Sequence, residues 1–155
     1  MKNEILQDKD IIMAGKIAKK SHEGQKYANH DYFEYHLINV LDRSIDLAIK
    51  MGKQYEEVKN IAIVALLHDI VEDCNYSVDK IRDLFGENIA TSVKMITYDK
   101  NKQTREEYYN QIYLNEMAKI VKYADASENK YNCMKDGDKK RVKYYDNIAR
   151  KMLKF

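Results

Sequence analysis

The segment 61–73 reads IAIVALLHDIVED and joins a dense apolar run to two pairs of titratable residues. Seven consecutive apolar residues precede His68 and Asp69, and Glu72 and Asp73 follow after two more apolar positions. An apolar run of this density packs inside a protein. On a helix with about 3.6 residues per turn, positions four apart share a face. The acidic pair is therefore expected to continue the face of the His-Asp pair.

Four titratable groups thus converge at the end of a buried segment, and burial of charge is costly. Each group left unpaired would cost on the order of several kcal/mol. The usual compensators are hydrogen-bonded partners or a metal ion. A divalent cation fits this mixture of imidazole and carboxylate best.

The rest of the chain favours an all-α fold, a compact helical bundle that forms a single domain over residues 1–155. Proline is absent, glycine occurs five times, and apolar residues recur mostly at three- and four-residue intervals. Ser77 resembles an N-cap, and Gly52 and Gly86 stand where the chain must reverse. The polar segment 23–33 is expected to be a loop. The predicted helices cover residues 7–22, 34–51, 55–71, 77–85, 87–97, 103–124 (with a break allowed in this last one) and 138–153.

The composition excludes a membrane-spanning protein and indicates a cytoplasmic one. Apolar residues make up 45% of the chain and charged residues 34%, and no uninterrupted apolar stretch approaches the length of about 20 residues that crosses a bilayer. The N-terminal sequence MKNEILQDKD lacks the basic and then apolar order of a secretory signal. Cys74 and Cys133 lie far apart in sequence, which favours reduced thiols over a disulfide framework.

The C-terminal segment is basic, although the net charge of the chain is only +2. Residues 130–154 contain nine Lys or Arg against three Asp. Val142, Tyr145, Ala149 and Met152 recur at helical spacing, so the lysines are interpreted as a solvated helix face. The alternatives are attraction for a phosphate-rich ligand or for nucleic acid, and the small net charge argues against nucleic acid.

Two other segments supply candidate partners for the His-Asp pair. His36 begins an amphipathic helix in YFEYHLINVLDRSI, and Asp125 follows an apolar stretch in AKIVKYADASENKYN. With His68 and Asp69 they form a set of nitrogen and oxygen ligands that suits Mn²⁺, Fe²⁺ or Zn²⁺ and, less well, Mg²⁺. One such ion would keep positions open for water and substrate.

Three motifs together resemble a known family. SHEGQKYANHDYFEYH looks like its opening motif, LLHDIVEDCNYSVDKIRDLFGENIATSVKMIT its central block, and VKYADASENKYN its closing Ala-Asp-x-x-x-Asn motif. The chain resembles the HD-domain metal-dependent phosphohydrolases. Within them it is similar to the hydrolase domain of the RelA/SpoT alarmone enzymes and to their small stand-alone relatives.

The resemblance implies a role for each matching residue. His36, His68, Asp69 and Asp125 would bind one divalent metal ion, which is Mn²⁺ in the alarmone hydrolases. Glu72 and Asp73 would be the catalytic acids, with Glu72 placing the attacking water or moving its proton. The residues implied around the nucleotide are Lys26, Tyr32, Thr97 and Asn129. Further tyrosines, among them Tyr27 and Tyr109, are interpreted mainly as packing residues, with one or two facing a base.

The implied reaction is hydrolysis of guanosine tetraphosphate (ppGpp) at the 3′ position, which releases pyrophosphate. At 155 residues the chain is expected to lack the synthetase and regulatory domains of the long enzymes, so degradation alone is expected. Two departures stand out: Leu37 replaces a proline, and Ala126 replaces a basic residue that follows the closing Asp in bifunctional enzymes. Ala126 weakens the case for one particular alarmone. The alternatives are therefore an HD phosphohydrolase of another nucleotide and an HD protein that binds a nucleotide without turnover. The sequence does not fix the oligomeric state.

Overall fold

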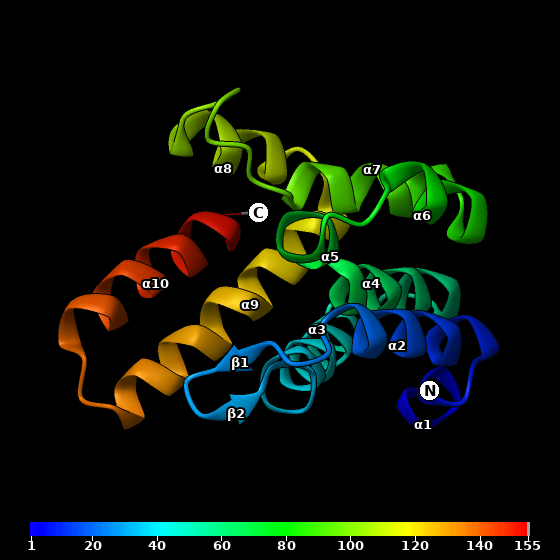
Figure 1. Ribbon diagram of the computed structural model, residues 1–155, viewed down its shortest axis with the longest axis horizontal. Helices are drawn as coiled ribbons and strands as arrows, with labels where there is room; N and C mark the ends of the chain where they lie inside the picture. The colour runs from blue at the N-terminus through cyan, green and yellow to red at the C-terminus, as the bar shows by residue number, and fades with distance from the viewer. Residues whose placement is uncertain (155) are drawn as a thin grey trace.

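The computed structural model describes residues 1–154 and is a bundle of helices with one small β-hairpin (Figure 1). The all-α prediction is confirmed. The helices are α1 (Lys2–Leu6), α2 (Lys9–Ser21), η1 (Phe33–Leu37, a π-helical turn), α3 (Ile38–Lys50), α4 (Tyr55–Leu67), α5 (Ile70–Cys74), α6 (Val78–Phe85), α7 (Glu87–Ile96), α8 (Arg105–Tyr113), α9 (Glu116–Lys135) and α10 (Lys139–Met152). The hairpin pairs β1 (Lys26–Tyr27) with β2 (His30–Asp31) in antiparallel register.

Helix α4 is the centre of the core. From Ile61 to Leu67 every side chain is at most 1% exposed. A helix that is apolar on all sides must be surrounded, and α4 packs against α2, α3, α7 and α9. His68 follows α4 directly, so the packing of α4 in the core fixes the position of this imidazole.

Local signals explain several helix boundaries. The Ser77 hydroxyl accepts a hydrogen bond from the Lys80 backbone N–H, which confirms the predicted N-cap of α6. Gly86 has φ of 91° between α6 and α7, a conformation that residues with a side chain rarely adopt. Asn115 caps α9 by accepting from the Ala118 backbone N–H at 2.9 Å.

The structure corrects the predicted helix over 55–71. It is interrupted by a turn at His68 and Asp69, and α5 begins anew at Ile70. The apolar residues Ile70 and Val71 continue the preceding pattern, so the sequence carries no mark of this break. The acidic pair therefore lies on a separate short helix, although the Asp73 backbone N–H still donates to the Asp69 carbonyl at 2.9 Å.

Other boundaries differ from the predictions in smaller ways. The N-terminal α1 was not predicted, and the predicted loop 23–33 contains the hairpin and the start of η1. The predicted helix 103–124 is broken at Leu114, and its second part, α9, continues to Lys135. This extension places Asp125 and Asn129 one turn apart on the same helix.

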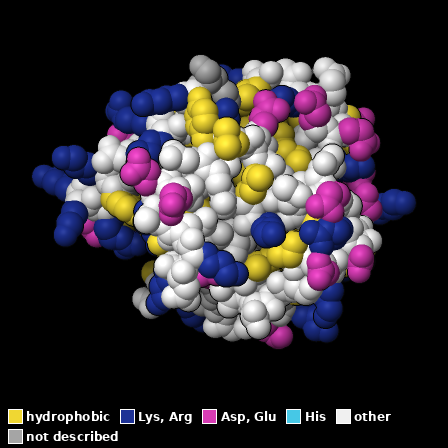
Figure 2. Space-filling model, turned by 90° about the horizontal axis from the view of Figure 1, so that it is seen from above, with side chains coloured by type: hydrophobic (Ala, Val, Ile, Leu, Met, Phe, Trp, Pro, Cys, Tyr) yellow, Lys and Arg dark blue, Asp and Glu magenta, His cyan; other side chains and the backbone are white. Residues whose placement is uncertain are grey.

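The basic segment contains the end of α9 and the whole of α10, which packs along α9 (Figure 1). Ile148, Ala149 and Met152 are buried, and the Lys and Arg side chains of α10 are exposed. Figure 2 shows Lys and Arg projecting from the end of the molecule that holds the α9–α10 turn. This arrangement agrees with a solvated helix face. No helix within residues 1–154 combines the length and apolar character that crossing a membrane requires.

Candidate metal centre

Three separate elements bring His36, His68 and Asp125 together in the interior. His36 lies on the π-helical turn η1, His68 follows α4, and Asp125 lies on α9. One ligand atom from each lies within 4.8 Å of the others, and all three residues are buried. His36 Nε2 is 3.1 Å and His68 Nε2 is 3.8 Å from Asp125 Oδ1. We call these three residues the candidate cluster.

Asp69, the fourth predicted ligand, lies beside this cluster. Its Oδ2 is 3.2 Å from His68 Nε2 and also accepts a hydrogen bond from the Tyr32 hydroxyl. Burial raises the pKa of Asp69, but the neighbouring His68 outweighs it and holds that pKa below the usual range. Asp69 is therefore an ionised carboxylate at the edge of the cluster.

The chemistry of the cluster fits a divalent cation. His68 Nδ1–H donates to the Ala65 carbonyl at 2.7 Å, which leaves Nε2 as the ring nitrogen that can bind a metal ion. That Nε2 atom is buried and lacks a hydrogen-bond partner. Burial lowers the pKa of His68, whereas Asp69 and Asp125 raise it further than burial lowers it. These carboxylates thus attract positive charge to the point where Nε2 lies, and a metal ion supplies that charge.

Asp125 is oriented by two residues of its own helix. Lys122 Nζ donates to Oδ2 at 3.0 Å, and Asn129 Nδ2 donates to Oδ1 at 2.9 Å. The Tyr27 hydroxyl in turn donates to Asn129 Oδ1 at 2.7 Å, and the Tyr27 ring stacks on His36. Burial raises the pKa of Asp125, but Lys122 and the histidines lower it well below its usual value.

A pocket of about 260 Å³ opens over this cluster. Lys122 and Arg105 contribute positive charge to its wall, Asp69, Glu72 and Asp125 contribute negative charge, and tyrosines line much of the rest. We call it the site pocket; it is lined by Tyr27, Tyr32, His36, Asp69, Glu72, Arg105, Tyr109, Lys122, Asp125, Asn129, Tyr144, Tyr145 and Ile148. With a divalent cation held among these carboxylates, an anionic ligand with an aromatic part would match this lining.

The structure does not bury the predicted catalytic acids. Glu72 and Asp73 are exposed, although the sequence suggested that they end a buried segment. Glu72 accepts from the Tyr98 backbone N–H at 2.6 Å, and Asp73 accepts from Gln25 Nε2 at 3.0 Å. Partial burial raises the pKa of both carboxyl groups, and the negative charge of Asp69 adds to this effect. Only Glu72 of the two lines the site pocket.

The residues predicted around the nucleotide fall into two groups. Tyr32 and Asn129 line the site pocket, but their polar groups already bond to Asp69, Asp125 and Tyr27. Thr97 lines an adjoining pocket of about 470 Å³ that shares Glu72 and Arg105 with the site pocket. Lys26 is exposed on β1 and is not among the residues that line the site pocket.

Sequence reasoning missed several residues of the pocket wall. Lys122 precedes Asp125 by three positions on α9, a helical spacing that could have linked the two. Arg105, Tyr144 and Tyr145 come from α8 and α10, and no local pattern connects those helices to the HD segment. The packing of α8 and α10 against α9 brings them to the site pocket.

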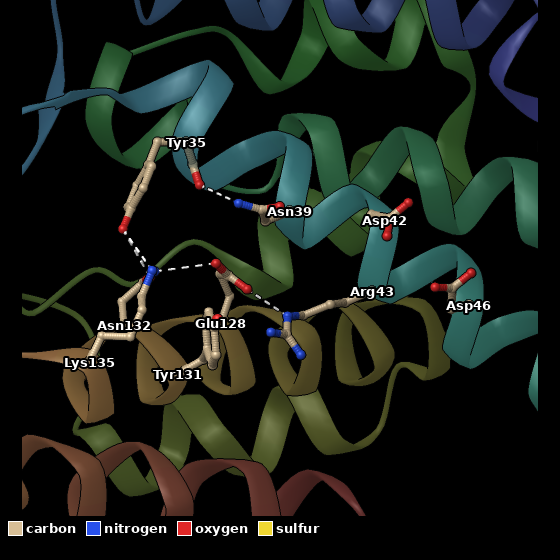
Figure 3. A pocket seen from close by; sticks show the side chains of 9 residues that line it. All are labelled: Tyr35, Asn39, Asp42, Arg43, Asp46, Glu128, Tyr131, Asn132 and Lys135. Atoms are coloured by element: carbon tan, nitrogen blue, oxygen red, sulfur yellow. Dashed lines mark hydrogen bonds and ion pairs between the residues drawn. The ribbon is translucent and has the colours of Figure 1, made fainter.

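A second pocket, of about 370 Å³, lies between α3 and α9 (Figure 3). Its polar groups satisfy one another. Arg43 Nε donates to Glu128 Oε2 at 2.6 Å, Asn132 Nδ2 donates to Glu128 Oε1 at 3.3 Å, and the Tyr35 hydroxyl donates to Asn132 Oδ1 at 3.2 Å. Within residues 1–154, none of the buried side-chain atoms without a partner belongs to this α3–α9 pocket. We therefore assign the chemistry to the site pocket.

A family model described as the HD domain matches residues 33–130, the span that carries His36, His68, Asp69 and Asp125. The chain belongs to the HD domain family. Membership implies a divalent metal ion, and the candidate cluster is a site with suitable ligands. The π turn at His36 and the interruption at His68 both lie within this HD span.

This HD domain is similar in sequence to parts of longer proteins. It is 33% identical over 88 residues to a guanosine-3′,5′-bis(diphosphate) 3′-pyrophosphohydrolase of Aquifex aeolicus, a match covering 57% of this chain and 12% of that protein. It is 32% identical over 75 residues to the 3′-pyrophosphohydrolase MESH1 of Drosophila melanogaster, covering 46% of this chain and 42% of the relative. These matches span less than half the length of either relative.

A solved structure, described as that of a metazoan ortholog of SpoT that hydrolyzes ppGpp, has the same fold. The TM-score is 0.67 at 23% sequence identity, covering 94% of this chain and 84% of the other. The likeness extends well beyond the residues matched by the family model. The HD helical fold therefore accounts for nearly all of this chain.

Proposed function

We propose that this HD domain is a metal-dependent 3′-pyrophosphohydrolase of ppGpp that acts in the cytoplasm as a single domain over residues 1–155. The observation that carries the proposal is the buried, unpartnered His68 Nε2 beside the carboxylates of Asp69 and Asp125, which line the site pocket together with Arg105 and Lys122. The names of the two sequence relatives support ppGpp as the substrate.

The proposed ligands are His36, His68, Asp69 and Asp125, and Mn²⁺ is the proposed ion. When bound, the ion would lower the pKa of a coordinated water and polarise a phosphoryl oxygen. The protein's part is to hold the ligands in one arrangement. The Ala65 carbonyl fixes the His68 ring, Lys122 and Asn129 fix Asp125, and Tyr32 fixes Asp69.

Glu72 is the proposed acid or base of the reaction. It lines the site pocket, and the Tyr98 backbone N–H holds one of its oxygens and leaves the other available to a water. Its raised pKa brings the carboxyl closer to the range in which it can accept and return a proton. Asp73 does not line the site pocket and is proposed to orient the site. We call Glu72 and Asp73 the acidic edge.

The charges of the pocket wall suit a nucleotide with several phosphates. Lys122 lies against Asp125, and Arg105 belongs to both the site pocket and the adjoining pocket that contains Thr97. These two cations are proposed to receive the phosphates, and Tyr27 and Tyr109 to face the base. Lys26, exposed on β1, is proposed to meet the phosphates only once substrate is bound.

Ala126, the departure that weakened the case for ppGpp, is weaker support for another nucleotide than its sequence position suggested. Its side chain is 1% exposed and packs within the core, and it is not part of the site pocket. The loss of a basic residue at this position therefore leaves the pocket wall unaltered. The alternative of another nucleotide is retained because the tyrosines of α10 form a wall that is compatible with other bases.

The test is a product assay with Mn²⁺ over a panel containing ppGpp, other nucleotides and cyclic nucleotides. We expect ppGpp to yield GDP and pyrophosphate, and Glu72→Ala to abolish turnover while the protein retains its metal. Turnover of another panel member in the absence of ppGpp hydrolysis would reject the proposed substrate. A protein that fails to retain metal after supply of Mn²⁺ would reject the hydrolase mechanism altogether.

A further inference from the structure

His22 is a buried histidine outside the candidate cluster. It follows the last residue of α2, is 1% exposed, and is not among the residues that line the site pocket. Its Nδ1 lies 2.7 Å from Gln25 Oε1, and its Nε2 is buried without a hydrogen-bond partner. A buried nitrogen without a hydrogen-bond partner costs free energy of folding, so packing alone does not explain a histidine at this position.

A chain of contacts joins His22 to the acidic edge of the site. Gln25 Nε2 donates at 3.0 Å to Asp73 Oδ2, and the Gln25 backbone N–H donates to the His22 carbonyl at 2.9 Å. The Gln25 carbonyl accepts from the Tyr32 backbone N–H at 3.0 Å. Gln25 is thus fixed at its main chain as well as at its side chain.

The direction of these bonds follows from their chemistry. An ionised Asp73 carboxylate can only accept, so the Gln25 amide must present its NH₂ to Asp73 and its oxygen to His22. The oxygen in turn requires a hydrogen on His22 Nδ1. Asp73, Gln25 and the His22 tautomer therefore determine one another.

Two neighbours of His22 strengthen this arrangement. Its ring packs at 4.8 Å, between centroids, on Tyr32, whose hydroxyl donates to Asp69. Cys74 Sγ is 3.3 Å from Nδ1, and burial together with Asp73 raises the pKa of that thiol. Cys74 therefore stays a neutral thiol and does not compete as an anion for the Nδ1 hydrogen.

We propose that His22 is a positioning residue that fixes the Asp73 carboxylate through Gln25. The proposal rests on the proposed hydrolase function, because it assigns a purpose to the orientation of Asp73 in that reaction. His22 acts through Gln25 and touches neither substrate nor metal. Its role is to hold the Asp73 carboxylate in the same orientation in every turnover.

The first test is independent of activity. Nitrogen-15 spectra of the histidine rings should assign the Nδ1–H tautomer to neutral His22. In Gln25→Leu, which removes the acceptor and keeps a side chain of similar size, that preference should disappear. Finding the Nε2–H tautomer in the wild-type protein would overturn the proposed link from His22 through Gln25 to Asp73. Since this spectrum needs no substrate, it decides the inference even if ppGpp turnover fails.

The second test separates positioning from packing. His22→Phe keeps a ring against Tyr32 but removes Nδ1, whereas His22→Asn keeps an N–H donor toward Gln25. We expect His22→Phe to lower kcat by about 10- to 100-fold, with KM and Mn²⁺ content unchanged, and His22→Asn to recover part of the loss. His30→Phe, the same change at an exposed histidine, should leave kcat unaltered. An unchanged kcat in a folded His22→Phe, or a loss that His22→Asn does not relieve, would reject the positioning role.

Discussion

The two pockets that flank α9 differ in how their buried charges are satisfied. In the α3–α9 pocket, Glu128 is 3% exposed and bonds to both Arg43 and Asn132 (Figure 3). Next to Asp69 and Asp125 of the site pocket, His68 is 2% exposed, and its Nε2 has no hydrogen-bond partner. Paired charges stabilise an arrangement, whereas an unmet one reserves a place for something else. Polarity alone would not have separated the pockets.

The largest expected effect comes from removing the unmet nitrogen itself. His68→Ala should reduce retained Mn²⁺ from about one ion per chain to near zero, because the ring supplies a proposed ligand that no neighbour replaces. Phosphohydrolase activity should fall to background. Metal analysis after gel filtration, with circular dichroism to establish folding, measures both. If His68→Ala held Mn²⁺ as tightly as the wild type, the candidate cluster would not be the metal site.

The next effect should distinguish the proposed catalytic acid Glu72 from the proposed metal ligands, because only kcat and not Mn²⁺ content should change. Glu72→Gln keeps the shape of the side chain and an acceptor for the Tyr98 N–H, but it cannot exchange a proton. We expect kcat to fall by about 10²- to 10⁴-fold while Mn²⁺ content stays at the wild-type level. A matched control is Glu87→Gln, since Glu87 is an exposed acid on α7 that bonds to Arg82. Loss of metal in Glu72→Gln would move Glu72 into the ligand set.

The sequence predicted which residues meet in the candidate cluster better than it predicted the surroundings of that cluster. His36, His68, Asp69 and Asp125 stand in motifs that the apolar pattern marks, and three of them meet in the interior. The break at His68 stayed hidden because Ile70 and Val71 continue the apolar run. The wall formed by Arg105 and Tyr145 depends on how α8 and α10 pack, and the bond from Gln25 to Asp73 joins positions 48 residues apart. Such contacts arise from tertiary structure, which local periodicity does not record.

A third effect concerns stability in the presence of metal. Without a cation, carboxylates and imidazoles crowd the candidate cluster, so binding should stabilise the folded state. At free Mn²⁺ about 100 times the Kd, the gain would be about 2.7 kcal/mol, or a rise in Tm of about 5 to 10 °C for a chain of this size. Thermal unfolding with and without Mn²⁺ measures it. His68→Ala should lose the shift and Glu72→Gln should keep it, so an equal shift in all three proteins would mean that Mn²⁺ acts elsewhere.

The smallest effect should come from the α3–α9 pocket and should change stability alone. Arg43→Ala leaves Glu128 buried with only Asn132 as a partner, although the Arg43 side chain is 41% exposed, so solvent already screens part of the pair. We expect a loss of about 1 to 2 kcal/mol, a fall in Tm of about 3 to 6 °C, and kcat within about twofold of wild type. Replacing both partners, in Arg43→Met with Glu128→Leu, removes the stranded charge and should recover most of the stability. A large loss of kcat in Arg43→Ala at a temperature where the protein is folded would show that the two sides of α9 are coupled, and the distinction between a structural pocket and a reactive one would no longer hold.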